Sequence, residues 1–176
     1  MCISCWWNRR MIVLLTAAWF CAVAYAGAET KAPFSLTIGA VNSKVSAGSQ
    51  IWILVALENI SGHEISVYRE YTPDQGGFVY TADVRDEKAT AVPETKFNRR
   101  LQSHDTPEEF AREPYVVLGS GGEQGLGPGM RMTDRIDVSR LYDLSRPGTY
   151  TIQVQRLDLG SKTFVRSNKI SVTVTH

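Results

Sequence analysis

Residues 142–152 read Tyr142-Asp-Leu-Ser-Arg-Pro-Gly148-Thr-Tyr150-Thr-Ile152, and this segment carries the strongest structural signal in the chain. A proline followed by a glycine marks a turn. After the turn, apolar and polar residues alternate, with Tyr150, Ile152 and Val154 on the same side of the alternation. A period of two residues is typical of a β-strand with one buried face. The segment therefore predicts a tight corner that leads into a half-buried strand.

The same alternation recurs on both sides of this segment. It is clear over residues 34–40, 65–69, 78–84 and 170–175, with turn clusters rich in glycine and asparagine between them. Residues 51–57 are apolar on both faces, which indicates a central strand that is covered on each side or at its ends. The pattern predicts about seven to nine short strands with almost no helix, as in a β-sandwich or a small barrel.

The corner resembles the one that precedes the penultimate strand of immunoglobulin-like domains. There a Gly-x-Tyr turn places a tyrosine whose hydroxyl bonds back to upstream backbone. Gly148 and Tyr150 fit these two places, and Ile152 stands where antibody domains have their second cysteine. The resemblance implies an all-β, immunoglobulin-like antiparallel β-sandwich over residues 34–175, in which these three residues have structural roles.

Residues 34–175 are also similar to small bacterial immunoglobulin-like domains, and loosely to the intracellular proteinase inhibitor family of bacilli. The matching pieces are Asn59-Ile-Ser-Gly62 and Gly148-Thr-Tyr150. This resemblance implies protease inhibition as one function to test. The chain departs from the pattern in its long inserted loop and in its apparent export segment, and a shared sandwich does not imply a shared task.

The first residues have the composition of an export signal. Arg9 and Arg10 precede an apolar run over residues 11–23, and Ala24-Tyr-Ala26 has the small-x-small pattern of a cleavage site. We therefore expect a signal peptide over residues 1–26, a flexible segment over 27–33, and a secreted or periplasmic domain with no membrane contact after cleavage. The alternative is an uncleaved anchor, since residues 11–28 nearly reach spanning length. Lipidation of Cys21 and twin-arginine export fit the flanking residues poorly.

Cysteine use and charge restrict the chemistry of the domain. All three cysteines, Cys2, Cys5 and Cys21, lie in the leader, which excludes disulfides and a cysteine nucleophile from the domain itself. The net charge of the whole chain is only +1, and removal of Arg9 and Arg10 leaves the domain nearly neutral. A dedicated nucleic-acid binder usually has a strong basic excess. We therefore expect no nucleic-acid partner.

Residues 86–114 interrupt the strand pattern. Thr106, Pro107 and Glu109 have the spacing of a helix N-cap, a first helical residue and a capping-box partner, and Pro114 would end the helix. We predict an inserted loop with one short helix. Its charged side chains are candidates for contact with a partner, since loops on rigid sandwiches commonly carry recognition; they are Lys96, Arg99, Arg100, Glu108 and Glu109.

The glycine-rich residues 119–129 predict a flexible connector and a second contact loop. Gln124 stands where a Gly-x-Gly-x-x-Gly motif needs its third glycine, and the Lys-Ser/Thr pair of a P-loop is absent, so a phosphate site is not expected. Trp52, the only tryptophan outside the leader, lies in the most apolar segment and is expected to pack in the core.

Residues with catalytic chemistry are sparse. The histidines are His63, His104 and His176, and no two of them have metal-ligand spacing. Ser103-His104-Asp105 contains the residue types of a triad, but triad members converge from separate elements of a fold. We expect no enzyme activity, metal or cofactor. The sequence favours a non-catalytic secreted binding or accessory module that recognises a protein partner. Protease inhibition is the main alternative and carbohydrate binding a weaker one, while the oligomeric state stays open.

Overall fold

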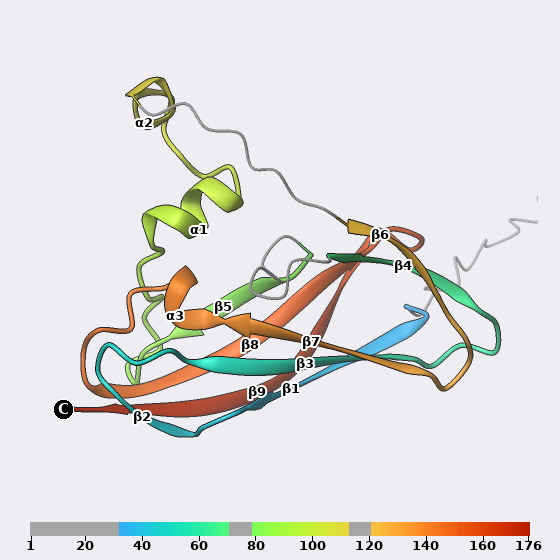
Figure 1. Ribbon diagram of the computed structural model, residues 1–176, viewed down its shortest axis with the longest axis horizontal. Coiled ribbons are helices and arrows are strands. Elements are labelled where there is room, and N and C mark those ends of the chain that lie inside the picture. The colour runs from blue at the N-terminus through green and yellow to red at the C-terminus, as the bar shows by residue number, and fades with distance from the viewer. Residues whose placement is uncertain (1–31, 71–78, 113–120) are drawn as a thin grey trace, which may run out of the picture.

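The computed structural model describes residues 32–70, 79–112 and 121–176, and most of its strands form two sheets (Figure 1). The first sheet has three antiparallel strands, in the order β1 (Phe34–Ala40), β3 (Trp52–Asn59) and β7 (Arg131–Asp137). Sequence alternation sets its two faces. Ile53, Val55 and Leu57 of β3 are fully buried, and the residues between them lie on the outer face.

The second sheet has four strands in the order β2-β9-β8-β5. They are β2 (Lys44–Ser46), β5 (Thr81–Arg85), β8 (Gly148–Asp158) and β9 (Thr163–Thr175). The strands β8 and β9 form a long antiparallel hairpin, whereas β2 runs parallel to the end of β9. The chain therefore crosses from the first sheet to the second between β1 and β2. Backbone hydrogen bonds flank the parallel segment, from Thr173 N to Ser43 O (2.8 Å) and from Ala47 N to Thr175 O (2.7 Å).

A separate antiparallel pair consists of β4 (Ile65–Glu70) and β6 (Gly121–Leu126). The prediction of a flexible connector over residues 119–129 is therefore wrong for residues 121–126; residues 119 and 120 lie outside the described part. At Gly121 a Cβ atom would overlap the side chain of Tyr68 on the paired strand. Glycine at this position serves the close approach of two strands.

The strand order gives the fold class. The strands β1, β3 and β7 correspond to A, B and E of an immunoglobulin domain, and β5, β8 and β9 correspond to C, F and G. The fold is thus the immunoglobulin-like antiparallel β-sandwich that the sequence predicts. Its core lies between the two sheets. Ile152, Val154 and Val172 of the second sheet are fully buried, and full burial of one such side chain stabilises the fold by about 1.5–3 kcal/mol.

The corner before β8 has a tyrosine bonded to upstream backbone. The Tyr150 hydroxyl donates a hydrogen bond to the carbonyl oxygen of Arg146 at 2.7 Å, and the ring is buried. Gly148 begins the strand, and Ile152 lies in the core two residues beyond the tyrosine. The turn and the first buried residues of β8 are therefore fixed by the same short segment.

A polar cluster lies among the apolar residues between the sheets, and we call Arg69, Tyr80, Asp134 and Arg156 the inter-sheet cluster. The Tyr80 hydroxyl donates to Asp134 Oδ2 at 2.7 Å, and Arg69 Nε donates to Asp134 Oδ1 at 3.2 Å. Arg156, only 6% exposed, donates to the Tyr80 hydroxyl (3.3 Å) and to the carbonyl oxygen of Tyr68 (2.6 Å). Burial and then the Asp134 carboxylate raise the pKa of Tyr80 far above its usual value. The cluster ties β4, β7 and β8 together.

The expectation that Trp52 packs in the core is wrong. Because Ile53 points inward, the register of β3 places Trp52 on the outer face, where it is half-buried. Leu54, two residues further on the same face, is 41% exposed, so β3 is not covered on both sides. The apolar character of residues 51–57 therefore marks a central strand with an apolar outer surface.

Candidate binding surface

The insertion between β5 and β6, described over residues 86–112, holds two short helices where the sequence predicts one. They are α1 (Lys96–Leu101) and α2 (Pro107–Arg112), and Figure 1 shows both standing off one end of the sandwich. Thr95 is the N-cap of α1, and its hydroxyl accepts a hydrogen bond from Asn98 N at 3.2 Å. Lys-Phe-Asn-Arg-Arg-Leu has neither a capping-box acid nor a leading proline, and this is why α1 was missed.

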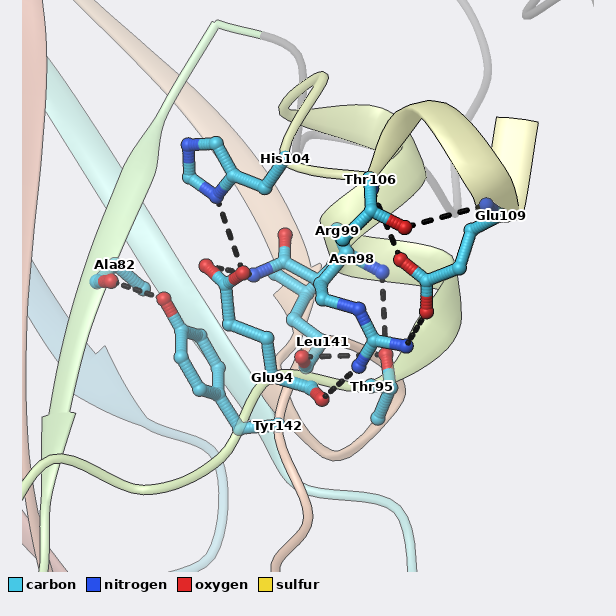
Figure 2. Close-up of polar contacts among 10 residues, drawn as sticks. All are labelled: Ala82, Glu94, Thr95, Asn98, Arg99, His104, Thr106, Glu109, Leu141 and Tyr142. Atoms are coloured by element: carbon cyan, nitrogen blue, oxygen red, sulfur yellow. Dashed lines mark hydrogen bonds and ion pairs between the residues drawn. The ribbon is translucent and has the colours of Figure 1, made fainter. Parts of the chain in front are cut away.

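Thr95 also attaches the insertion to the sandwich (Figure 2). Its backbone N–H donates to Leu141 O at 2.9 Å. Its hydroxyl donates to Arg140 O at 2.7 Å. Both carbonyls belong to α3 (Val138–Leu141), a single turn that follows β7. A further backbone bond runs from Asp143 N to Pro93 O at 2.9 Å. The base of α1 is therefore fixed to the rigid part of the molecule.

Glu94 connects several parts of the insertion. Its Oε1 accepts a hydrogen bond from Asn98 Nδ2, and its Oε2 lies next to His104 Nδ1, both at 3.1 Å (Figure 2). Its carbonyl oxygen accepts a hydrogen bond from Arg99 Nη1 at 3.2 Å. Tyr142 lies nearby, with its hydroxyl donating to Ala82 O, and burial followed by the Glu94 carboxylate raises its pKa to about 12. The network orders the segment that joins α1 to the sandwich.

The helix α2 has the capping box that the sequence predicts. Glu109 N donates to the Thr106 hydroxyl at 3.2 Å, and Thr106 N donates to Glu109 Oε2 at 3.0 Å (Figure 2). Arg99 of α1 forms an ion pair with Glu109 at 3.2 Å. The Thr106 N–H and the Arg99 guanidinium hold the pKa of Glu109 below its usual value. The two helices are thus linked by a charged pair as well as by the chain.

The five charged residues predicted for partner contact do not form one patch. Arg99 pairs with Glu109, and Arg100 Nε lies 3.5 Å from a carboxylate oxygen of Asp105, whose side chain is only 4% exposed. Lys96 and Glu108 are exposed. Arg99, Arg100 and Glu109 therefore hold the insertion together, and the exposed charges of its helices are the candidates for contact.

A second surface lies beside the insertion and was not foreseen. We define the Trp52 surface as Gln50, Trp52, Arg135, Asp137 and Arg140. The Arg135 guanidinium lies 4.4 Å from the centre of the Trp52 ring, and the Arg140 guanidinium lies over the Phe97 ring of α1 at 4.1 Å. Gln50, Trp52, Asp137 and Arg140 line a shallow hollow of about 130 Å³. Residues 51–57 are apolar throughout, so the sequence has no alternation that would have placed Trp52 on this face.

The side chains considered for a catalytic triad contact other residues and not one another. His104 contacts Glu94, while Asp105 contacts Arg100, so Ser103-His104-Asp105 forms no triad. Within residues 32–70, 79–112 and 121–176, no group of three histidine or acidic side chains is placed to hold a metal ion. In the same ranges no helix is both long and apolar enough to cross a membrane.

Comparison with known proteins gives distant structural likenesses. No protein-family model matches the chain, and no curated protein sequence matches it. The resemblance to the proteinase inhibitor family of bacilli therefore gains no support beyond the β-sandwich itself.

Three solved structures show how low the similarity is in sequence and in structure. The CARDB domain of a Pyrococcus furiosus protein, in complex with di-metal ions, is 12% identical with a TM-score of 0.37, over 81% of this chain and 87% of that domain. An alkylpurine DNA glycosylase of Pseudomonas fluorescens, bound to DNA with an abasic site analog, is 11% identical with a TM-score of 0.40; 83% of this chain and 31% of that one are covered. A β-glucosidase of Erythrobacter marinus is 11% identical with a TM-score of 0.42, over 82% of this chain and 16% of that enzyme. These likenesses do not extend to function.

Proposed function

We propose that this chain is a non-catalytic, exported binding module that recognises a protein partner through its insertion. The observation that carries the proposal is the attachment of α1 to α3 by the backbone and side chain of Thr95. A segment already ordered before binding loses less conformational entropy when it binds. The apolar leader with Arg9, Arg10 and Ala24-Tyr-Ala26 supports export.

The exposed side of the insertion is polar and charged. Glu108 and Arg112 of α2 are exposed. Of the two helices, α2 stands further from the sheets (Figure 1). Such a surface suits a partner with complementary charges, and contacts of this kind chiefly determine specificity and the association rate. We assign the contact to α2 and to the exposed flank of α1. The glycine-rich loop was the second predicted contact loop; because its residues 121–126 form β6 and pair with β4, we do not assign the contact to them.

Affinity capture with a charge-exchange variant tests this assignment. The chain, tagged at its C-terminus, is expressed in cells of its own source, and the captured proteins are identified by mass spectrometry. The double variant Glu108→Lys/Arg112→Glu keeps the net charge but reverses the two exposed charges of α2. The matched control is Lys44→Glu/Glu64→Lys, which exchanges exposed charges on β2 and before β4.

The proposal expects specific capture by the unmodified chain and by the control, and loss of capture by the α2 variant. Equal capture by all three would contradict the role of α2. A captured protease whose activity the chain blocks would establish the inhibitor function instead. If no protein is captured, binding to a glycan array would favour the carbohydrate alternative.

A further inference from the structure

We infer that the Trp52 surface binds an acidic, partly apolar peptide segment of the partner. This inference rests on the proposed function and extends it by naming the chemistry of the partner. The surface begins on the outer face of β3 and β7 and reaches α1 through the stack of Arg140 on Phe97. It is therefore continuous with the insertion, and one partner can contact both.

The two arginines of this surface are ordered but uncompensated. Arg135 and Arg140 each lie over an aromatic ring, and neither guanidinium group forms an ion pair or a hydrogen bond within the part of the chain that the structure describes. Stacking uses the face of a guanidinium and leaves the N–H groups at its edge able to bind a carboxylate in a bidentate manner. Arg131 is the useful contrast, because it lies on the same outer face of β7 but pairs with Glu58 at 2.6 Å.

Apolar residues next to these arginines indicate that the ligand has apolar groups as well as negative charge. Leu54 is paired with Arg135 and is 41% exposed, and Val41, next to Trp52 across the β1–β3 pair, is 47% exposed. Together with the half-buried indole ring they make an apolar strip beside the two cations. Acidic glycans lack aliphatic side chains to cover such a strip, whereas a peptide with acidic and apolar residues supplies both.

Asp137 favours a peptide over an anionic membrane. It lines the hollow, is 7% exposed, and its Oδ1 accepts hydrogen bonds from Ser139 N (3.1 Å) and Ser139 Oγ (2.5 Å). A lipid phosphate group has no hydrogen-bond donor for this carboxylate, whereas a peptide N–H can donate to it. The amide of Gln50 in the same hollow can bond to a peptide group in the same way. The occupant is therefore a polypeptide with carboxylates for the arginines and N–H groups for Asp137.

Trp52 is the natural reporter of this site. In a full-length chain with Trp6, Trp7 and Trp19 replaced by phenylalanine, Trp52 is the only indole. Its fluorescence is titrated with a short synthetic peptide of alternating glutamate and leucine, and separately with the same peptide carrying lysine for glutamate. Polygalacturonate and phosphatidylglycerol vesicles are the other two probes. Arg135→Gln and Arg140→Gln are compared with Arg131→Gln, after circular dichroism shows that all are folded.

We expect the glutamate–leucine peptide to change the fluorescence saturably, and the lysine peptide to have no effect. Arg135→Gln and Arg140→Gln should each weaken binding about tenfold, as loss of a charge-assisted contact does, while Arg131→Gln binds as the parent chain does. Equal binding by all four proteins, no binding of the peptide, or a preference for polygalacturonate or vesicles would overturn the inference. The capture experiment with the α2 variant is independent of these outcomes, so failure here leaves the proposed function standing.

Discussion

The Tyr80 hydroxyl donates a hydrogen bond to Asp134 Oδ2 at 2.7 Å across the interior of the sandwich. Tyr80 is 2% exposed, and Asp134 faces inward on β7, where it is paired with Val55 of β3. A carboxylate at such a place needs partners, because burial of an uncompensated charge is costly. Tyr80 and Arg69 supply them, and this makes the bond a structural requirement of the inter-sheet cluster.

Replacement of Tyr80 by phenylalanine should lower the free energy of unfolding by about 1–3 kcal/mol, since Asp134 Oδ2 and Arg156 Nη1 both lose a partner. Urea denaturation at neutral pH measures the change. Tyr68→Phe is the control because its side chain is on the exposed side of β4, and it should shift stability by no more than about 0.5 kcal/mol. Equal stability of the two variants would contradict the role of the Tyr80 hydroxyl.

Alkaline pH should destabilise the fold through Tyr142. Burial, and then the Glu94 carboxylate, raise its pKa to about 12, whereas an unfolded tyrosine titrates near 10. Between these values the unfolded state loses the proton first, so stability is complete below about pH 10 and falls as the pH rises toward 12. The pKa of Tyr80 is also raised, so its titration likewise lowers the stability of the fold as the pH rises. Urea midpoints across this range should decline less steeply for Tyr142→Phe, and parallel curves would show that Tyr142 does not contribute.

Loss of the N-terminal cap of α2 should destabilise this helix without destabilising the sandwich. Thr106→Ala removes the acceptor of the Glu109 N–H and should weaken α2 by about 0.5–2 kcal/mol. Because α2 stands off the sandwich, we expect faster amide hydrogen exchange within α2 and little change in the global unfolding midpoint. Thr106→Ser keeps the hydroxyl and should restore slow exchange. A global loss of stability without local opening would mean that α2 is part of the cooperative core.

Quenching of Trp52 fluorescence by ions should report the positive charge of Arg135 beside the ring. In the chain with Trp52 as its only tryptophan, iodide should quench the fluorescence more strongly than caesium, because Arg135 lies over the ring and attracts anions. Arg135→Gln should reduce quenching by iodide, and Arg131→Gln, which removes a cation paired with Glu58, should leave it nearly unchanged. Equal quenching by the two ions would show that the positive potential is absent.

Sequence reasoning succeeded where a signal is local. The capping box of α2 and the corner at Tyr150 depend on residues at most four positions apart, and both hydrogen bonds are present. The period-two pattern of 34–40 and of the segment after Gly148 likewise depends only on neighbours, and both are strands. These local patterns were enough to predict the immunoglobulin-like fold class.

Sequence reasoning failed where a residue's structure depends on another residue that is distant in the sequence. Gly121 belongs to a strand because it pairs with Glu70, and a run of glycines carries no trace of that pairing. The side of β3 on which Trp52 falls depends on the packing of Ile53, and an all-apolar segment has no alternation from which to read it. The Trp52 surface combines residues from β3, β7 and α3, so only the fold could reveal it.

The parallel pairing of β2 with β9 has a mechanical consequence. Two parallel strands that are pulled apart by their opposite ends slide along each other, so the bonds across them carry the force together. The bonds at Ser43 and Ala47 flank this segment and share the load. Tension applied between the start of β2 and the end of β9 would therefore load these bonds together, whereas an antiparallel hairpin pulled at its two ends opens bond by bond.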